Sequence, residues 1–148
     1  MFLAEANPLN ASALIFPILE CLHIFGFAVC VGTIAIVDLR MLGVAMNRQG
    51  IPEVSRDLAP WTLAGLALIV LSGPLMLSSD PDMYYLNPSF QVKMACFAAA
   101  LLFNYTIHRK VALAGGPGGA ARLVGSISLA LWASVIFGGI FIAFTGQL

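Results

Sequence analysis

The sequence predicts an all-α integral membrane protein, a four-helix bundle that forms one transmembrane domain over residues 1–148. Two observations support this fold class. Hydrophobic residues make up 60% of the chain and charged residues only 9%, which is more apolar surface than one soluble core can hide. The apolar residues also gather in four stretches, and each approaches the roughly 20 residues that a helix needs to cross a bilayer.

The four predicted helices are bounded by turn-forming residues. They cover residues 13–38, 60–77, 89–108 and 123–145. Pro52 and Pro60 bracket the expected first connection, the turn-rich segment 78–88 forms the second, and the glycine-rich AGGPGGAAR forms the third. None of these connections is long enough to be a second domain.

The basic residues predict the orientation of the bundle. Six of the seven Lys and Arg residues lie in or beside the first and third connections: Arg40, Arg48, Arg56, Arg109, Lys110 and Arg122. By the positive-inside rule, both termini are expected on the outer (periplasmic) side of a bacterial inner membrane. The N-terminus has no basic region and no small-residue cleavage site, so the first helix is expected to direct insertion.

Polar residues within the first and third helices fall on one face of each. At about 100° per residue, Glu20 and Asp38 lie about 60° from His23 on the first helix. On the third helix, His108 lies about 60° and Asn104 about 20° from Lys93. Each of these helices therefore carries a single polar stripe.

The two stripes have matching spacing, because 38 − 23 and 108 − 93 are both fifteen residues. Aligned in depth, they predict two polar layers about 22 Å apart along the helix axes. The outer layer contains His23 and Lys93, with Glu20 nearby. The inner layer contains Asp38, Arg40, Asn104 and His108. One haem ligated by both histidines of a single chain would need them at the same depth, which this spacing does not give.

Each of these residues also has an ordinary explanation. His108 sits beside Arg109 and Lys110 as a headgroup-level residue would, and Asp38 with Arg40 would serve as an interfacial ion pair or topology anchor. Asp38 and His108 also form a candidate structural or proton-handling pair. The cysteines Cys21, Cys30 and Cys96 and the methionines are typical of helix packing.

His23 and Lys93 are harder to explain by packing alone. Ionisable groups inside a span cost a few kcal/mol and usually face a bundle interior with a functional purpose. Lys93 lies only about one turn inside the outer boundary, so snorkelling towards the headgroups is an alternative for it. We expect His23 to have a partner at its own depth.

The ordered pattern Leu22-His23, Cys30-Val31-Gly32, Asp38-Leu39-Arg40, LIVLSGPLML and FQVKMACFAAALLFN resembles the CopD-like four-helix membrane superfamily. This group includes the copper-resistance protein CopD, the HemJ-type protoporphyrinogen oxidase and related small membrane families. The resemblance implies that His23 matches a first-helix histidine implicated in haem binding and that Lys93 matches an important third-helix lysine. Cys30 stands where many members have tryptophan, and Asn104 where an aromatic residue or histidine is usual.

Three functional classes follow from these observations. The first is a haem b-binding redox protein with His23 as axial ligand, with Lys93, Arg40 and Asn104 as further cofactor-binding candidates. The second is a copper-handling or copper-transport protein, with His23 as a metal ligand beside the cysteines and Met76. The third is a non-catalytic subunit of a larger complex, whose helix-four glycines let a partner helix approach.

The expected surroundings are the same for all three classes. The protein is expected to lie in the lipid bilayer and to contact either a second copy of the chain or a membrane or periplasmic redox partner. No nucleic acid is expected as a partner. Under the haem hypothesis, a quinone or a porphyrin is the expected substrate. The pattern leaves open whether the protein is an enzyme.

Overall fold

Four long apolar helices form the molecule. A computed structural model describes residues 12–116 and 118–145. The helices that are long and apolar enough to cross a membrane are α2 (Ile15–Leu42), α3 (Ile51–Ser79), the continuous segment Pro88–Ala114 and α7 (Gly119–Thr145). This confirms the prediction of an all-helical protein with four candidate membrane spans.

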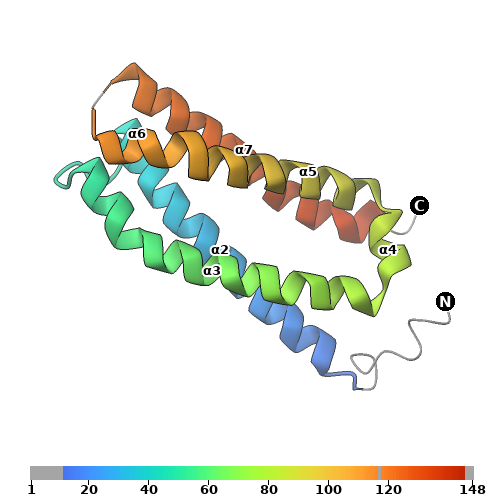
Figure 1. Ribbon diagram of the computed structural model, residues 1–148. Coiled ribbons are helices and arrows are strands. Elements are labelled where there is room, and N and C mark those ends of the chain that lie inside the picture. Colours follow the sequence, from blue (N-terminus) through green and yellow to red (C-terminus); the bar gives the residue numbers. More distant parts are fainter. Residues whose placement is uncertain (1–11, 117, 146–148) are drawn as a thin grey trace.

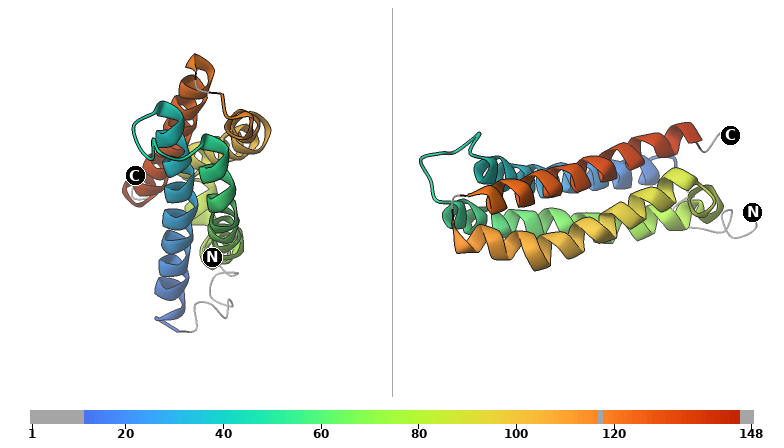
Figure 2. Two further views of the ribbon diagram at one scale, coloured as in Figure 1. Left: turned by 90° about the vertical axis from the view of Figure 1, so that its left-hand side faces the viewer. Right: turned by 90° about the horizontal axis from the view of Figure 1, so that it is seen from above.

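The helices form two antiparallel pairs. Helix α2 packs along α3, and α5 (Pro88–Phe103) packs along α7, while α2 also crosses α7 (Figure 1). The start of α2, the short helix α4 (Pro81–Tyr85) and the end of α7 lie at one end, which we name the α4 end. The opposite, α6 end contains the α2–α3 connection and α6 (Arg109–Ala114), as the two further views also show (Figure 2).

The second helix begins earlier than the sequence predicts. Helix α3 starts at Ile51, so Pro60 lies inside it and does not bound a loop. Pro52 occupies the first turn, where no backbone N–H is needed, and the Glu53 carboxylate accepts from the Gly50 N–H. Pro60 lacks the N–H that would donate to the carbonyl of Arg56, and Arg56 is an exposed residue. A proline near the membrane boundary is therefore compatible with a continuous helix.

The third span is interrupted by a π-helical turn. Residues Asn104–His108 form this turn between α5 and α6, and the Arg109 N–H donates to the Asn104 carbonyl five residues earlier. A π turn adds a residue to the helical repeat and changes the direction of the side chains that follow. The regular 100° spacing expected from the sequence therefore does not hold between Lys93 and His108.

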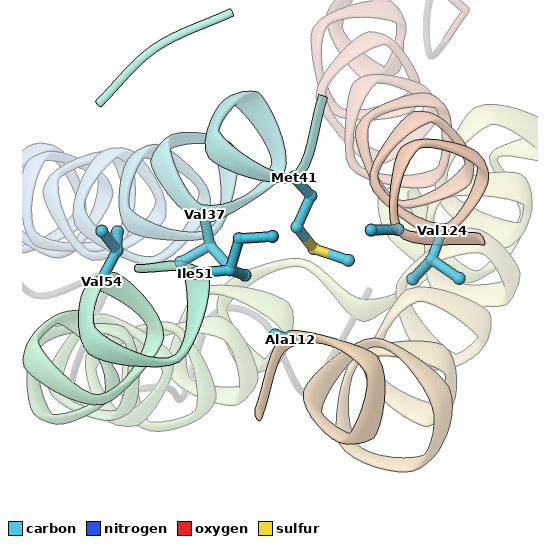
Figure 3. Packing of buried hydrophobic residues seen from close by; sticks show 7 residues of the cluster. Val37, Met41, Ile51, Val54, Ala112 and Val124 are labelled. Carbon is cyan, nitrogen blue, oxygen red and sulfur yellow. The ribbon is translucent and has the colours of Figure 1, made fainter. Parts of the chain in front are cut away.

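The core is divided along the bundle. At the α6 end, residues of α2, α3, α6 and α7 pack together (Figure 3). They include Val37, Met41, Ile51, Val54, Ala112 and Val124. Nearer the middle, a second cluster forms around the buried ring of Trp132, with Cys30 and Ile69 among its members. The polar residues of interest lie within and beside these two clusters.

Asn87 ties the α4 end of the α5–α7 pair together. Its side-chain oxygen accepts from the N–H groups of Ser89 and Phe90 and from the Thr145 hydroxyl, while its amide donates to the Ile142 carbonyl at 3.0 Å. One buried side chain thus caps the start of α5 and holds the last turn of α7.

Candidate functional site

Asp38 and His108 form a buried pair near the α6 end. His108 Nε2 lies 2.6 Å from Asp38 Oδ1, and their side chains are 5% and 0% exposed. The π turn ends at His108 and directs its ring towards α2. The structure therefore brings together the two residues of the predicted second polar layer, across 70 positions of sequence.

The Asp38 carboxyl group is incompletely paired. Oδ1 accepts from His108, but Oδ2 is buried without a hydrogen-bond partner among the described residues. The Ser128 hydroxyl of α7 lies beside this carboxyl group and is itself buried outside good hydrogen-bond geometry. A carboxylate can accept about four hydrogen bonds, so Asp38 retains unused acceptor capacity.

Arg40 and Asn104 do not join His23. The Arg40 Nε donates to the Gln49 carbonyl at 2.7 Å and so fixes the α2–α3 connection. Arg40 is 17 residues from His23 on the same helix, which is about 25 Å along the axis. Asn104 is buried at the start of the π turn. Both lie on the side of the Asp38–His108 pair, at the depth that the sequence predicts for the inner layer.

His23 is held by Ser72 of α3. His23 Nδ1 lies 2.8 Å from Ser72 Oγ, and Ser72 Oγ lies 2.5 Å from the Leu68 carbonyl oxygen. The tautomer with the proton on Nδ1 satisfies both contacts, because Ser72 then accepts from His23 and donates to Leu68, and it leaves a lone pair on Nε2. Nε2 has no hydrogen-bond partner within residues 12–116 and 118–145.

The α2–α3 interface gives the His23 ring its place. A Cβ on Gly73 would lie 3.4 Å from His23 Cε1, so the glycine leaves room for the ring. Thr33 and Thr62 are in hydrogen-bond contact at 2.8 Å further along the same interface. Thr33 follows His23 by ten residues on α2 and Thr62 precedes Ser72 by ten residues on α3, as a regular antiparallel helix pair requires. The histidine is thus fixed by a rigid helix pair.

Lys93 reaches the same region from the other helix pair. It is half-buried, and a Cβ on Gly138 would lie 3.0 Å from Lys93 Cβ while one on Gly139 would lie 3.5 Å from Nζ. Its ammonium group has no acidic or hydrogen-bond partner among the described residues, and it is near enough to His23 for their charges to interact. Two glycines of α7 therefore accommodate the lysine stem.

Glu20 contributes to the α4 end but not to a pair with Lys93. It is exposed, and it lies near Tyr84 of α4. Burial, with smaller effects from the charges of Glu20 and Asp80, raises the pKa of Tyr84 above its ordinary value. Tyr84 therefore remains a neutral phenol at physiological pH.

Aromatic rings connect the His23 region to the middle of the bundle. The ring centroids of His23 and Phe27 are 6.4 Å apart, those of Phe27 and Trp132 are 6.4 Å apart, and those of Phe97 and Trp132 are 6.1 Å apart. The last two contacts are edge-on, a favourable geometry for aromatic pairs. A packed row of aromatic rings therefore leads from the histidine to the core around Trp132.

The soft ligands proposed for copper are dispersed. Cys21 is exposed, while Cys30 and Cys96 belong to the apolar cluster around Trp132. Over the part of the chain that the structure describes, no three His, Cys, Asp or Glu side chains gather as a metal site would require. Cys30 and Cys96 therefore pack in the bundle, and His23 meets a serine where a metal cluster would place further ligands.

Three contributors were not identified from the sequence. Ser72 and Ser128 resemble ordinary small residues of an apolar helix, and their importance depends on partners 49 and 90 positions away in the chain. Trp132 lies in a helix whose hydropathy gave no other signal. The available clue was that a span containing a histidine needs a polar neighbour at the same depth on another helix.

Comparison with known proteins places the chain in one family. The family model described as "Family of unknown function (DUF6644)" matches residues 13–145, which include all four candidate spans. No curated protein and no solved structure matches the chain. A match over 133 of 148 residues (145 − 12) covers nearly the whole protein. The chain belongs to the DUF6644 family.

Proposed function

We propose that the chain is a haem b-binding redox protein of a bacterial inner membrane, with His23 as an axial ligand. The observation that carries this proposal is the Ser72 contact, which occupies Nδ1 of His23 and leaves Nε2 free. Ligating histidines usually donate their other ring N–H to a neighbouring acceptor, which fixes the tautomer and the ring orientation. The contact between His23 and Ser72 is of this kind.

The residues around His23 fit a haem in their chemistry. Imidazole is a usual haem ligand, and Phe27, Phe97 and Trp132 supply aromatic and apolar walls. Lys93 supplies an ammonium group without an acidic partner in the described chain, and the propionates of a haem carry the opposite charge. The matching positions of His23 and Lys93 in the CopD-like resemblance point to the same ligand.

Within such a site each residue has a separate task. Haem, when bound, supplies one-electron transfer. Ser72 orients the imidazole, Gly73 leaves room for its ring, and the α2–α3 interface keeps both in place. Lys93, on the opposite helix pair, would neutralise a propionate of the bound haem. Arg40 and Asn104 act elsewhere, because they lie towards the α6 end.

The two histidines of the chain provide a matched test. The protein is produced in cells supplied with a haem precursor, purified in detergent, and assayed for haem per chain. We expect stoichiometric haem in the wild type and in His108→Gln, none in His23→Ala, and a weakened haem retention in Lys93→Ala. Full haem with an unaltered spectrum in His23→Ala would contradict the proposal, provided that all variants elute as monodisperse species.

Copper handling and a purely structural role have less support. The dispersed cysteines give no soft-ligand cluster, as described above. Gly125 and Gly138, the small residues that a partner helix would need, pack against Asp38 and Lys93 of the chain's own helices. No specific observation favours either function. Both would give purified protein without stoichiometric haem, so the haem assay distinguishes them from the proposal.

A further inference from the structure

Unpaired cationic side chains gather at the α6 end of the bundle. They come from the α2–α3 connection and from α3, α6 and α7, and we name them the basic collar: Arg48, Arg56, Arg109, Lys110 and Arg122. All are exposed, and within residues 12–116 and 118–145 their side chains make no ion pair and no hydrogen bond. The basic collar therefore presents charge that the described chain does not neutralise.

The buried cluster at the α6 end sets the depth of the basic collar. This cluster takes residues from the same three helices, among them Val54 of α3, Ala112 of α6 and Val124 of α7 (Figure 3). Arg56, Lys110 and Arg122 each lie two residues from the cluster member of their own helix, which is about 3 Å along the axis. Because the cluster members pack together, these cations from three helices lie at closely similar depths.

Exposed aromatic residues lie just inside this level. Trp61 is 63% exposed and follows Arg56 by five residues on α3, about 7 Å towards the middle of the bundle. Tyr105 is 39% exposed and precedes Arg109 by four residues, about 6 Å in the same direction. Tryptophan and tyrosine are enriched where a membrane protein meets the headgroups. The basic collar is therefore at the level of lipid headgroups, with the apolar spans on its inner side.

The charge at this end is complementary to an anionic surface. The exposed carboxylates near the basic collar are Glu53 and Asp57, and Glu53 already accepts from the Gly50 N–H. At the α4 end the exposed charged residues are acidic instead: Glu20, Asp80 and Asp82. A zwitterionic headgroup brings a cation together with its phosphate, so a headgroup with net negative charge gains more from the basic collar.

We propose that the basic collar binds the headgroups of anionic phospholipids in the leaflet at the α6 end. Its members belong to three helices, so lipids bound there contact both α3 of one helix pair and α6 and α7 of the other. This inference goes beyond the proposed function and does not depend on haem, because it involves neither His23 nor Lys93.

The lipids that the full chain retains test the proposal. Protein in dodecylmaltoside is mixed with equal amounts of dioleoyl phosphatidylglycerol and dioleoyl phosphatidylcholine, and the lipids that co-elute in gel filtration are quantified by mass spectrometry. We expect phosphatidylglycerol to be preferred about tenfold at about 50 mM salt, and the preference to fade at about 0.5 M salt because of screening. Inorganic phosphate at matched ionic strength should not displace the lipid, since it has no acyl chains to pack on the spans.

Matched variants show whether the basic collar is responsible. The triple change Arg56→Gln, Lys110→Gln and Arg122→Gln should bring the preference close to one. The exchange of the same residues to Lys, Arg and Lys should preserve it, because the charges remain. Asp57→Asn removes an exposed carboxylate beside the basic collar and should increase the preference. Equal retention of the two lipids by the wild type, or an unchanged preference in the triple Gln variant, would overturn the proposal. Displacement of the lipid by inorganic phosphate would do the same.

Discussion

At the scale of single residues, the two histidines have opposite ring nitrogens engaged. His23 uses Nδ1 to contact a neutral serine, which leaves Nε2 available. His108 uses Nε2 to contact the Asp38 carboxylate and is almost fully buried. A histidine whose Nε2 has no partner can bind a ligand through that atom. A histidine that contacts a buried carboxylate holds two helices together. The two histidines of the chain are thus held in different ways.

Ser72→Ala tests the orientation of His23. A ligating histidine usually makes a hydrogen bond through the ring nitrogen that does not bind the metal. Loss of that hydrogen bond typically lowers metal affinity about ten- to a hundredfold. We expect Ser72→Ala to weaken haem retention by about this factor and to broaden its absorption bands, while some axial ligation remains. Retention is measured by transfer of haem to an apo-globin acceptor.

Ser134→Ala is the control for that experiment. Like Ser72, Ser134 donates to the carbonyl four residues earlier, but it is exposed on α7 and touches no histidine. Ser134→Ala should therefore leave the rate of haem release unchanged. If the two alanine variants release haem at the same rate, Ser72 does not orient the ligand.

The Asp38–His108 pair should be coupled in stability. Removing one member of a buried pair costs about 3–5 kcal/mol because the other is left without a partner. We expect His108→Ala to lose about this much free energy of unfolding in mixed dodecylmaltoside and SDS micelles, and the double variant with Asp38→Asn to lose less than the sum of the single changes. Strictly additive losses would show that the pair contributes no interaction energy.

At the scale of helices, close contacts depend on glycine. A Cβ on Gly65 would lie 2.6 Å from the backbone nitrogen of Cys30, and one on Gly26 would lie 2.6 Å from Leu68 Cβ. Backbone groups of α2 and α3 therefore touch where these glycines face each other. Packing of this kind is the main attraction between helices in a membrane, where lipid is as apolar as the helix surface.

Gly65→Ala should separate α2 from α3. The added methyl group meets backbone atoms that cannot move aside, so we expect a loss of about 1–3 kcal/mol in the same micelle unfolding assay. Gly32→Ala is the matched control, because nothing lies within 4 Å of its added Cβ. If both variants unfold alike, the α2–α3 contact is looser than described.

The four spans were predictable because hydropathy alone determines them, but their ends were not. Pro60 resembles a helix boundary in sequence, yet α3 begins nine residues earlier, at Ile51, and passes through it. The π turn at Asn104–His108 was not predicted from the sequence, and it ends at His108, which contacts Asp38 of α2. The sequence predicted the common depth of Asp38 and His108. It did not reveal Ser72, whose role depends on helix register.

At the scale of the whole molecule, charge is distributed unevenly along the bundle. Described basic residues other than Lys93 lie towards the α6 end, and the start of α2 and the end of α7 lie at the α4 end. Zero formal net charge conceals this asymmetry. The orientation in the membrane follows from it as a prediction.

Reporter fusions test that orientation. With Arg48 and Lys110 on the cytoplasmic side, an alkaline phosphatase fused to the C-terminus should be active, and a green fluorescent protein at the same position should be dark. Fusions after Arg48 should give the reverse result. A fluorescent C-terminal fusion would invert the bundle and place His23 near the cytoplasm.

The central claim is that His23 holds a haem, and the absorption spectrum of the detergent-purified wild type tests it most directly. Protein produced with ample haem supply is recorded as oxidised and as dithionite-reduced. We predict a Soret band and, on reduction, the sharp α and β bands of a b-type haem, all of them absent from His23→Ala. A wild-type spectrum without a Soret band, in protein that binds copper stoichiometrically, would contradict the account.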